Sequence, residues 1–281
     1  MKKIIVNIFS CILSLLLTVT IFFTFVCISI GVNVNSKALN KFIISSGYSK
    51  SMSNKILTQL YYYADINGLP HNIFDDFVDL DFISGEIYDY IVSVSKNENK
   101  SKYIADINNK KIELEAKIKE YAIANMNLTE LQKSKLDKDV SDFVEQCANV
   151  YINGVKSDAL KAVSSYIKIT DKYFVKTVFL LILADLIILF ILIFIQKWKH
   201  RGYRNSLYSL IASEIMLAVL VGVILFFNVI NRIPIISKEL YCLVTNMLNG
   251  CLTTLYVSVA ILAILIIINI VVYVQSRKKV M

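Results

Sequence analysis

The chain has 281 residues, of which 56% are hydrophobic and 19% charged, and its mean hydropathy is +0.58. This composition excludes an ordinary soluble globular domain, and only 8 glycines and 2 prolines exclude collagen-like, disordered and turn-rich all-β chains. The formal net charge is +8, and its meaning depends on where the basic residues lie along the chain. The composition predicts an integral membrane protein.

Four segments are apolar over the roughly 20 residues that cross a bilayer core about 30 Å thick. They cover residues 4–30, 174–196, 207–229 and 250–274. The first follows two lysines, as a signal peptide would, but its apolar run is longer than a signal-peptide core and no A-x-A cleavage site follows. We therefore expect an uncleaved N-terminal anchor over residues 1–31 and a three-span domain over residues 174–281.

Basic residues lie at both ends of the chain and in one short loop. The sequence of that loop, KWKHRGYR, contains Lys197, Lys199, Arg201 and Arg204. Because cytoplasmic loops are enriched in lysine and arginine, both termini and this loop are predicted to be cytoplasmic. The frequent Lys, Ile and Asn residues are typical of an AT-rich bacterial genome. The predicted location is a bacterial cell membrane, with the lipid bilayer as a partner.

Residues 32–173 are predicted to form an extracytoplasmic domain inserted between the first and second spans. They contain 18 lysines, no arginine and 19 acidic residues, a net charge of −1, so no basic face is left for nucleic acid. Apolar residues recur at helical spacing, as in the stripe that runs from Leu136 to Tyr151, and no run of period two indicates a strand. The predicted fold class is all-α: a four-helix membrane bundle with a helical extracytoplasmic domain.

Local signals within this domain are helical as well. Thr129 and Gln132 have the spacing of a capping box, and the segment Gly68-Leu69-Pro70 should break the chain. Between Asp158 and Arg201 there is no glycine or proline, which predicts a continuous helix of roughly 40 residues, about 60 Å long. Such a stalk could relay motion across the membrane or serve only as a tether.

Asp185 and Glu214 are the only acidic residues within the predicted spans. Each lies about 15 Å from a cytoplasmic helix end, near the middle of the bilayer, so we expect an intramembrane polar pair that shares a proton. Intramembrane acids usually face the bundle interior and often mark a functional site. The pair could form a proton or cation relay, or it could be a protonated pair that holds the bundle together.

Catalytic and metal-binding patterns are absent from the sequence. The two histidines, His71 and His200, are expected on opposite sides of the membrane, and there is no zinc-ligand spacing, phosphate loop or dinucleotide fingerprint. An acidic stretch, Asp75 to Asp81, could attract a hard cation or be a solvated helix start, and it lacks the EF-hand pattern. We expect no enzymatic activity, no cofactor and no metal. The five cysteines are expected to be free, with a bridge from Cys147 to Cys242 or Cys251 as the alternative.

The chain resembles a group of uncharacterised four-span membrane proteins of Gram-positive bacteria. The resemblance covers nearly the whole length and rests on Gly68-Leu69-Pro70, Phe74, the DDFVDLD stretch and Tyr90-Ile91. The order of one span, a large outer domain and three spans is also similar to MacB-like ABC permeases. That second resemblance implies that residues 158–196 form a stalk and that a cytoplasmic ATPase contacts the 197–206 loop.

Three functions follow from these observations. The leading hypothesis is a non-enzymatic membrane protein whose outer helical domain binds a protein partner or senses the envelope, with the stalk as a relay. The alternative is a permease or regulator subunit coupled to a cytoplasmic ATPase. The third is a proton-linked transporter that uses Asp185 and Glu214 and, having four spans per chain, works as a homo-oligomer.

Overall fold

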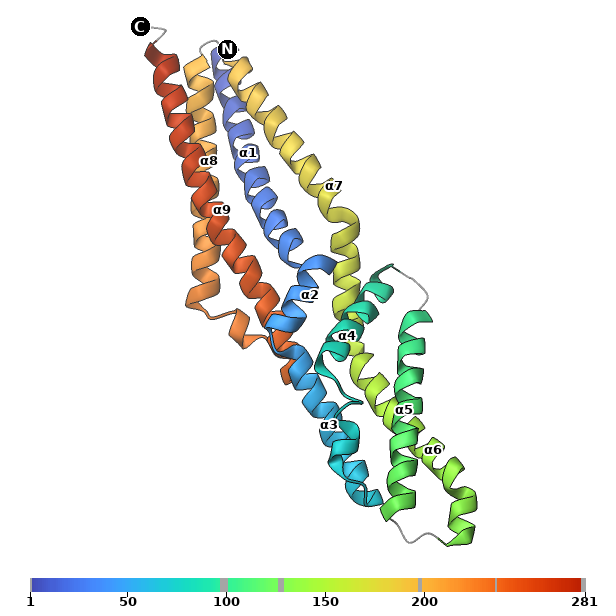
Figure 1. Ribbon diagram of the computed structural model, residues 1–281. Helices are drawn as coiled ribbons and strands as arrows, with labels where there is room; N and C mark the ends of the chain where they lie inside the picture. Colours follow the sequence, from blue (N-terminus) through green and yellow to red (C-terminus); the bar gives the residue numbers. More distant parts are fainter. Residues whose placement is uncertain (1, 97–100, 126–128, 197–198, 236, 279–281) are drawn as a thin grey trace. The chain divides into compact units, whose positions relative to one another are not determined.

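The computed structural model describes residues 2–96, 101–125, 129–196, 199–235 and 237–278. No strand occurs among these residues, so the all-α prediction is confirmed for the part of the chain described (Figure 1). The elements, in chain order, are α1 (Lys2–Asn33), α2 (Ser36–Ser45), α3 (Tyr48–Asn67), the 3-10 helix η1 (His71–Phe74), α4 (Leu80–Lys96), α5 (Ser101–Asn125), α6 (Glu130–Val155), α7 (Asp158–Ile195), α8 (Lys199–Phe226), the 3-10 helix η2 (Ile230–Arg232) and α9 (Lys238–Lys278).

The chain divides into two compact units. The membrane unit comprises Met1–Asn35, Ile169–Pro234 and Thr245–Met281, and the helical unit comprises Ser36–Lys168 and Ile235–Val244. Helices α1 and α8 belong to the membrane unit, and α2 to α6 belong to the helical unit. Helices α7 and α9 each begin in the helical unit and continue in the membrane unit.

Helices α1, α7, α8 and α9 are long and apolar enough to cross a membrane, so this is a multi-pass membrane protein. Each contains most or all of one predicted span. α9 begins at Lys238, well before residue 250, because Leu243 and Met247 continue its buried face toward the N-terminus. α8 ends at Phe226, just ahead of Asn228, whose φ of 51° is incompatible with a continuing helix.

One leucine from each spanning helix lies in the core of the membrane unit. Leu17, Leu192, Leu217 and Leu262 are all fully buried there. The outer faces of the same helices carry exposed Phe, Leu, Ile and Val side chains, such as Leu180 and Phe194 on α7. Large apolar side chains suit an outer surface that contacts lipid, where they need no protein partner.

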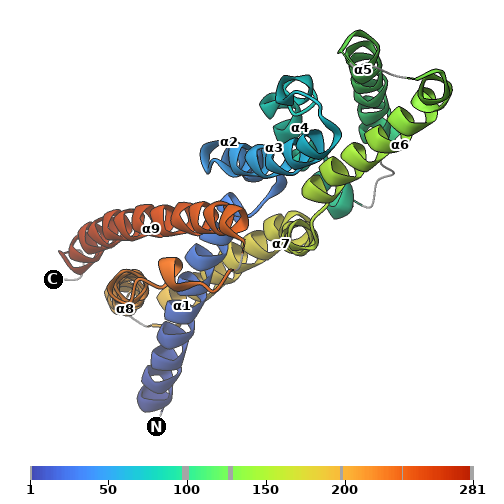
Figure 2. The same ribbon diagram turned by 90° about the horizontal axis from the view of Figure 1, so that it is seen from below.

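Polar side chains join α1 to α8, and the two helices lie side by side in both views (Figures 1 and 2). The hydroxyls of Ser14 and Ser209 are 2.8 Å apart, and Asn205 Nδ2 donates to Ser10 Oγ at 2.5 Å. Thr18 Oγ1 donates to the Ser209 carbonyl at 3.4 Å. Ser10, Ser14 and Thr18 recur at helical spacing on one face of α1, and this face forms a helix–helix contact with α8. Polar side chains bond between helices in this way within membranes.

The other end of α1 is hydrogen-bonded to α9. Ser29 Oγ donates to the Cys251 carbonyl, and Asn33 Nδ2 donates to Thr254 Oγ1, both at 2.7 Å. Together with a bond to α7 described below, these contacts make α1 the one spanning helix whose described side chains bond to all three others.

The helical unit is built around a continuous apolar core. Ile56, Leu60, Phe74, Ile87 and Val144 are almost fully buried in it. Phe74 lies in η1 and its ring meets Phe143 of α6 edge to face, with ring centroids 6.4 Å apart. This contact packs the 3-10 turn against α6.

The predicted break at Gly68-Leu69-Pro70 is confirmed. α3 ends at Asn67, and Gly68 closes it with a φ of 65°, a conformation that glycine adopts without a Cβ clash. Its N–H caps the helix by donating to the Ala64 and Asp65 carbonyls. Pro70 then precedes η1, which begins at His71.

The local signals of the fifth and sixth helices are confirmed in part. Thr129 and Gln132 form the predicted capping box at the start of α6. Lys119 pairs with Glu115 in the favoured i,i+4 orientation at 2.8 Å. Lys117, in contrast, bonds to Asp76 from the segment after η1 and not to Glu113, four residues earlier on its own helix.

The cysteines described are all free thiols, as expected. Cys147, on α6, is fully buried, and this burial raises the pKa of its thiol to about 12.

Because the thiolate is the reactive form, we expect alkylation by a maleimide at pH 8 to be at least 100-fold slower for Cys147 in the folded protein than after denaturation. Timed labelling and mass spectrometry of the Cys147 peptide would measure this. Equal alkylation rates in the folded and the denatured protein would contradict the burial of Cys147.

Candidate functional site

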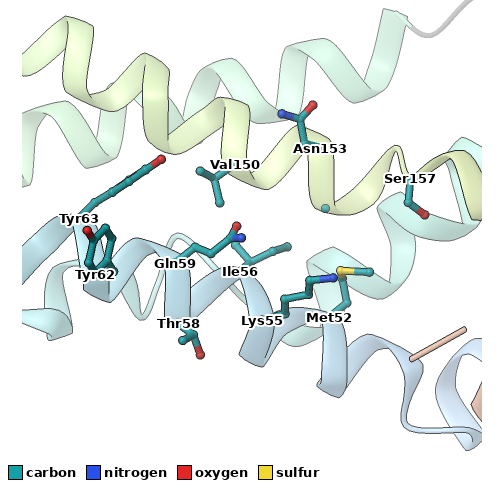
Figure 3. Close-up of a pocket in the computed structure, with 11 residues that line it drawn as sticks. Met52, Lys55, Ile56, Thr58, Gln59, Tyr62, Tyr63, Val150, Asn153 and Ser157 are labelled. Atoms are coloured by element: carbon teal, nitrogen blue, oxygen red, sulfur yellow. The ribbon is translucent and has the colours of Figure 1, made fainter. Parts of the chain in front are cut away.

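The helical unit has a groove of about 720 Å³ between α3 and α6 (Figure 3). Figure 3 shows α3 along one side of it and α6 along the other. The side chains that line the groove combine apolar, aromatic, amide and hydroxyl groups with one lysine: Met52, Lys55, Ile56, Thr58, Gln59, Tyr62 and Tyr63 from α3, Val150, Asn153 and Gly154 from α6, and Ser157 just after it.

Gly154 allows α3 and α6 to approach each other at this groove. A Cβ atom at this position would lie 2.8 Å from Ile56 Cδ1, so a larger residue would force the Ile56 side chain to shift.

Tyr62 and Gln59 provide an aromatic ring and an amide that can contact a ligand in the groove. Tyr62 is 63% exposed, and Ile66, one turn further along α3, is 64% exposed, so an apolar strip continues from the groove along the helix. Tyrosine rings are frequent anchors in protein interfaces because they offer a large rigid surface and a hydroxyl. The amides of Gln59 and Asn153 can donate to and accept from a peptide backbone.

The acidic stretch after η1 is paired with lysines. Lys117 Nζ donates to Asp76 Oδ2 at 2.5 Å, which lowers the pKa of Asp76 and raises that of Lys117. Lys110 Nζ donates to the Asp76 and Phe77 carbonyls at 3.1 and 3.3 Å. Among the described residues no group of three or more His, Cys, Asp or Glu side chains could hold a metal ion.

His71 belongs to a small exposed polar cluster on the helical unit. Its Nε2 lies 2.8 Å from Asp65 Oδ1, and its ring stacks on Tyr61 with centroids 4.3 Å apart. Tyr61 in turn donates to Asp75 at 3.0 Å. These contacts close the end of α3 against η1.

Asp185 lies beside a cavity of about 440 Å³ within the membrane unit. Thr24 of α1 donates to its Oδ2 at 2.9 Å, while its Oδ1 is buried without a hydrogen-bond partner. Asn269 of α9 lines the same cavity, and its Oδ1 is likewise buried and unpartnered, since only Nδ2 is used, in a 3.0 Å bond to Ser206 Oγ. An otherwise apolar cavity therefore contains two unused hydrogen-bond acceptors.

The predicted pairing of Asp185 with Glu214 is not seen as a hydrogen bond among the described residues. Glu214 does not line the cavity beside Asp185. Ala218 and Gly222, which share a stripe with Glu214 on α8, are exposed, and a Cβ at Gly222 would meet no atom within 4 Å. The packed face of α8 instead contains three fully buried serines, Ser206, Ser209 and Ser213.

The predicted cytoplasmic loop is largely helical. Lys197 lies outside the described residues, whereas Lys199 begins α8 and Arg201 and Arg204 are exposed in its first two turns. The helix starts this early because Gly202 packs directly on α7, where a Cβ would lie 2.6 Å from the Ile193 Cα. Residues 199–206, which were predicted to belong to a loop, therefore form the start of α8.

No family model matches this chain. No curated protein and no solved structure is similar to it. Its function is therefore argued from the groove, the cavity and the charges described above.

Proposed function

We propose that this chain is a membrane-anchored binding protein that accepts a segment of a partner protein in the groove between α3 and α6. The observation that carries the proposal is the groove itself, with Tyr62 exposed at its edge and the Gln59 and Asn153 amides beside it. The four spanning helices would hold the helical unit at the membrane surface.

We also propose on which side of the membrane the helical unit lies. The helical unit would lie outside the cytoplasm of a bacterial cell, with both termini inside. This orientation is supported by the basic residues at both chain ends and around Lys199, which the positive-inside rule places in the cytoplasm. The partner would then be an envelope or exported protein.

A peptide segment suits the groove better than a small polar molecule. The exposed strip that Tyr62 and Ile66 form extends the contact beyond the cavity, as an extended or helical segment would require. Lys55, at the groove wall, could pair with an acidic residue of the partner. The backbone of such a segment could bond to the Gln59 amide.

A photo-cross-linking experiment tests this proposal. We expect a full-length chain with a benzophenone amino acid at position 62 to cross-link to an envelope protein in cells of the native host. We expect Gln59→Ala to reduce the yield of the same adduct about fivefold or more, because typical anchors contribute at least 1 kcal/mol. Gel shift and mass spectrometry would identify the adduct.

The matched control places the same cross-linker at Ile112 of α5, which is 68% exposed and does not line the groove. An adduct obtained equally from positions 62 and 112 would reflect random encounter. No protein adduct from position 62, or an adduct that Gln59→Ala leaves unchanged, would also contradict the proposed groove.

Proton or cation movement through the membrane unit is a second candidate function, favoured by the unpartnered Oδ1 of Asp185 beside its cavity. A carboxyl with a free acceptor is the type of group that carries a proton or cation within a membrane. Asn269 would offer a second acceptor in the same cavity. This function would use Asp185 without Glu214.

Proton uptake into vesicles containing the purified chain tests this candidate. We expect Asp185→Asn to abolish uptake, because the amide cannot bind and release a proton near neutral pH. Glu214→Gln is the matched control, since Glu214 lies outside the cavity, and it should leave uptake unchanged. No uptake by the unmodified chain, or equal losses in both variants, would contradict the candidate.

A further inference from the structure

A second cavity in the membrane unit is polar and basic rather than apolar. It measures about 400 Å³ and lies between the first turns of α1 and the start of α8. Two guanidinium side chains, Arg201 and Arg204, line it together with the polar side chains of Asn7, Gln196, Asn205 and Tyr208. Neither proposed function uses this cavity.

The two arginines bring an uncompensated positive charge to the cavity. Neither takes part in an ion pair among the residues that the structure describes. They lie three residues apart on α8, so they are neighbours on one helix face. A guanidinium presents parallel N–H donors whose geometry matches two oxygens of a phosphate, which makes paired arginines a typical phosphate-binding arrangement.

The remaining groups of the cavity provide uncharged hydrogen bonds. Gln196 is almost fully buried, and its amide lines the cavity beside the arginines. Asn7 contributes a second amide and Tyr208 a phenolic hydroxyl. Amides and hydroxyls both donate and accept, so they suit a ligand that has hydroxyl groups next to its phosphate.

Apolar surface begins immediately beside this cavity on the same two helices. On α1, Ile8 and Ile12 are more than half exposed, and on α8, Ile211 and Ile215 are exposed one and two turns beyond Tyr208. The cavity therefore lies at the polar end of a surface that faces hydrocarbon. A ligand that spans both regions must carry a phosphate at one end and alkyl chains at the other.

We propose that this cavity binds the headgroup of an anionic glycerophospholipid such as phosphatidylglycerol. The guanidinium groups of Arg201 and Arg204 would contact the phosphate, and the amides of Gln196 and Asn7 would bond to the headgroup hydroxyls. The acyl chains would run along the exposed isoleucines of α1 and α8. Binding of this kind fixes one lipid at a defined place between two helices.

Fluorescence quenching in vesicles tests the proposal. Trp198 is the only tryptophan of the chain, and it lies three residues before Arg201 in the sequence. The full chain would be reconstituted in phosphatidylcholine that contains either brominated phosphatidylglycerol or brominated phosphatidylcholine as quencher. Salt at about 0.5 M would screen non-specific attraction between charges.

We expect the unmodified chain to bind phosphatidylglycerol at least about tenfold more strongly than phosphatidylcholine, given two arginine contacts. The double variant Arg201→Gln/Arg204→Gln should lose this preference, while quenching by brominated phosphatidylcholine stays unchanged and shows that the chain is still inserted. Lys199→Gln is the matched control: it removes an exposed charge that does not line the cavity, so the preference should remain.

Three results would overturn the proposal. The first is no preference in the unmodified chain. The second is an equal loss in Lys199→Gln and in the double arginine variant, which would show a general charge effect. The third is loss of the preference on addition of millimolar inorganic phosphate, which would assign the cavity to a free phosphate ion instead of a lipid.

Discussion

Replacement of Gly202 by alanine is expected to destabilise the membrane unit by about 1–3 kcal/mol, the usual range for overpacking. The added Cβ would lie 2.6 Å from the Ile193 Cα and 2.7 Å from the Leu192 carbonyl oxygen. These are backbone atoms, so no side-chain rotation can relieve the clash. Helix α8 would have to move away from α7, and buried Leu192 would lose part of its packing.

Thermal unfolding of the detergent-solubilised protein measures this effect. We expect Gly202→Ala to lower the Tm by about 2–12 °C, given 2–4 °C per kcal/mol for a chain of this size. Gly222→Ala is the matched control on the same helix, because a Cβ there meets no atom within 4 Å. This control should leave the Tm unchanged or raise it slightly, since alanine favours a helix more than glycine does. Equal Tm values for both variants would contradict the close contact between α7 and α8.

Replacement of Phe74 by alanine is expected to destabilise the helical unit by about 3–5 kcal/mol, the largest effect that we anticipate. Phe74 is fully buried, and its ring packs edge to face on Phe143. Its removal deletes the contact between η1 and α6 and leaves a cavity in the core. Because Phe74 lies in a short 3-10 helix, neighbouring side chains have little freedom to fill the space.

The buried thiol of Cys147 reports this loss directly, since it lies one turn after Phe143 on α6. When opening and closing are fast relative to labelling, the alkylation rate follows the free energy of opening, so 3–5 kcal/mol should accelerate labelling about 100- to 4000-fold. Tyr62→Ala removes an aromatic ring that is 63% exposed and serves as the control, with a rate within about threefold of the unmodified chain. A similarly small change in Phe74→Ala would mean that η1 does not stabilise α6.

Several features could be predicted from the sequence because they depend on neighbouring residues alone. The length and apolarity of the four spans, the break at Gly68 and the capping box at Thr129 are of this kind, and all are present.

Features that depend on which partner a helix meets could not be predicted. α8 has two neighbouring faces of small or polar residues, one with Ser209 and one with Glu214, and the sequence does not rank them. The face with Ser209 packs on α1, where Ser14 offers a matching hydroxyl. Lys117 likewise bonds to Asp76, which is distant in sequence, instead of Glu113 on its own helix.

The groove between α3 and α6 had no sequence signal of its own. Met52 and Ile56 recur at helical spacing and are both buried, but the space beside them depends on how closely α6 approaches. That approach is set by Gly154, whose role became visible only from its contact with Ile56. A single glycine in a helical sequence does not indicate which helix it will meet.

The hydrogen bonds of α1 have a consequence for biosynthesis. This helix leaves the ribosome before α7, α8 and α9, which later receive its polar side chains. Thr18, Thr20 and Thr24 each donate to the carbonyl four residues earlier in their own helix, at 3.0, 3.1 and 2.9 Å. Bonds of this type satisfy a hydroxyl within a single helix. Newly made α1 can therefore insert into lipid with its threonine hydroxyls satisfied. These hydroxyls can bond to the other spanning helices once those helices have been inserted.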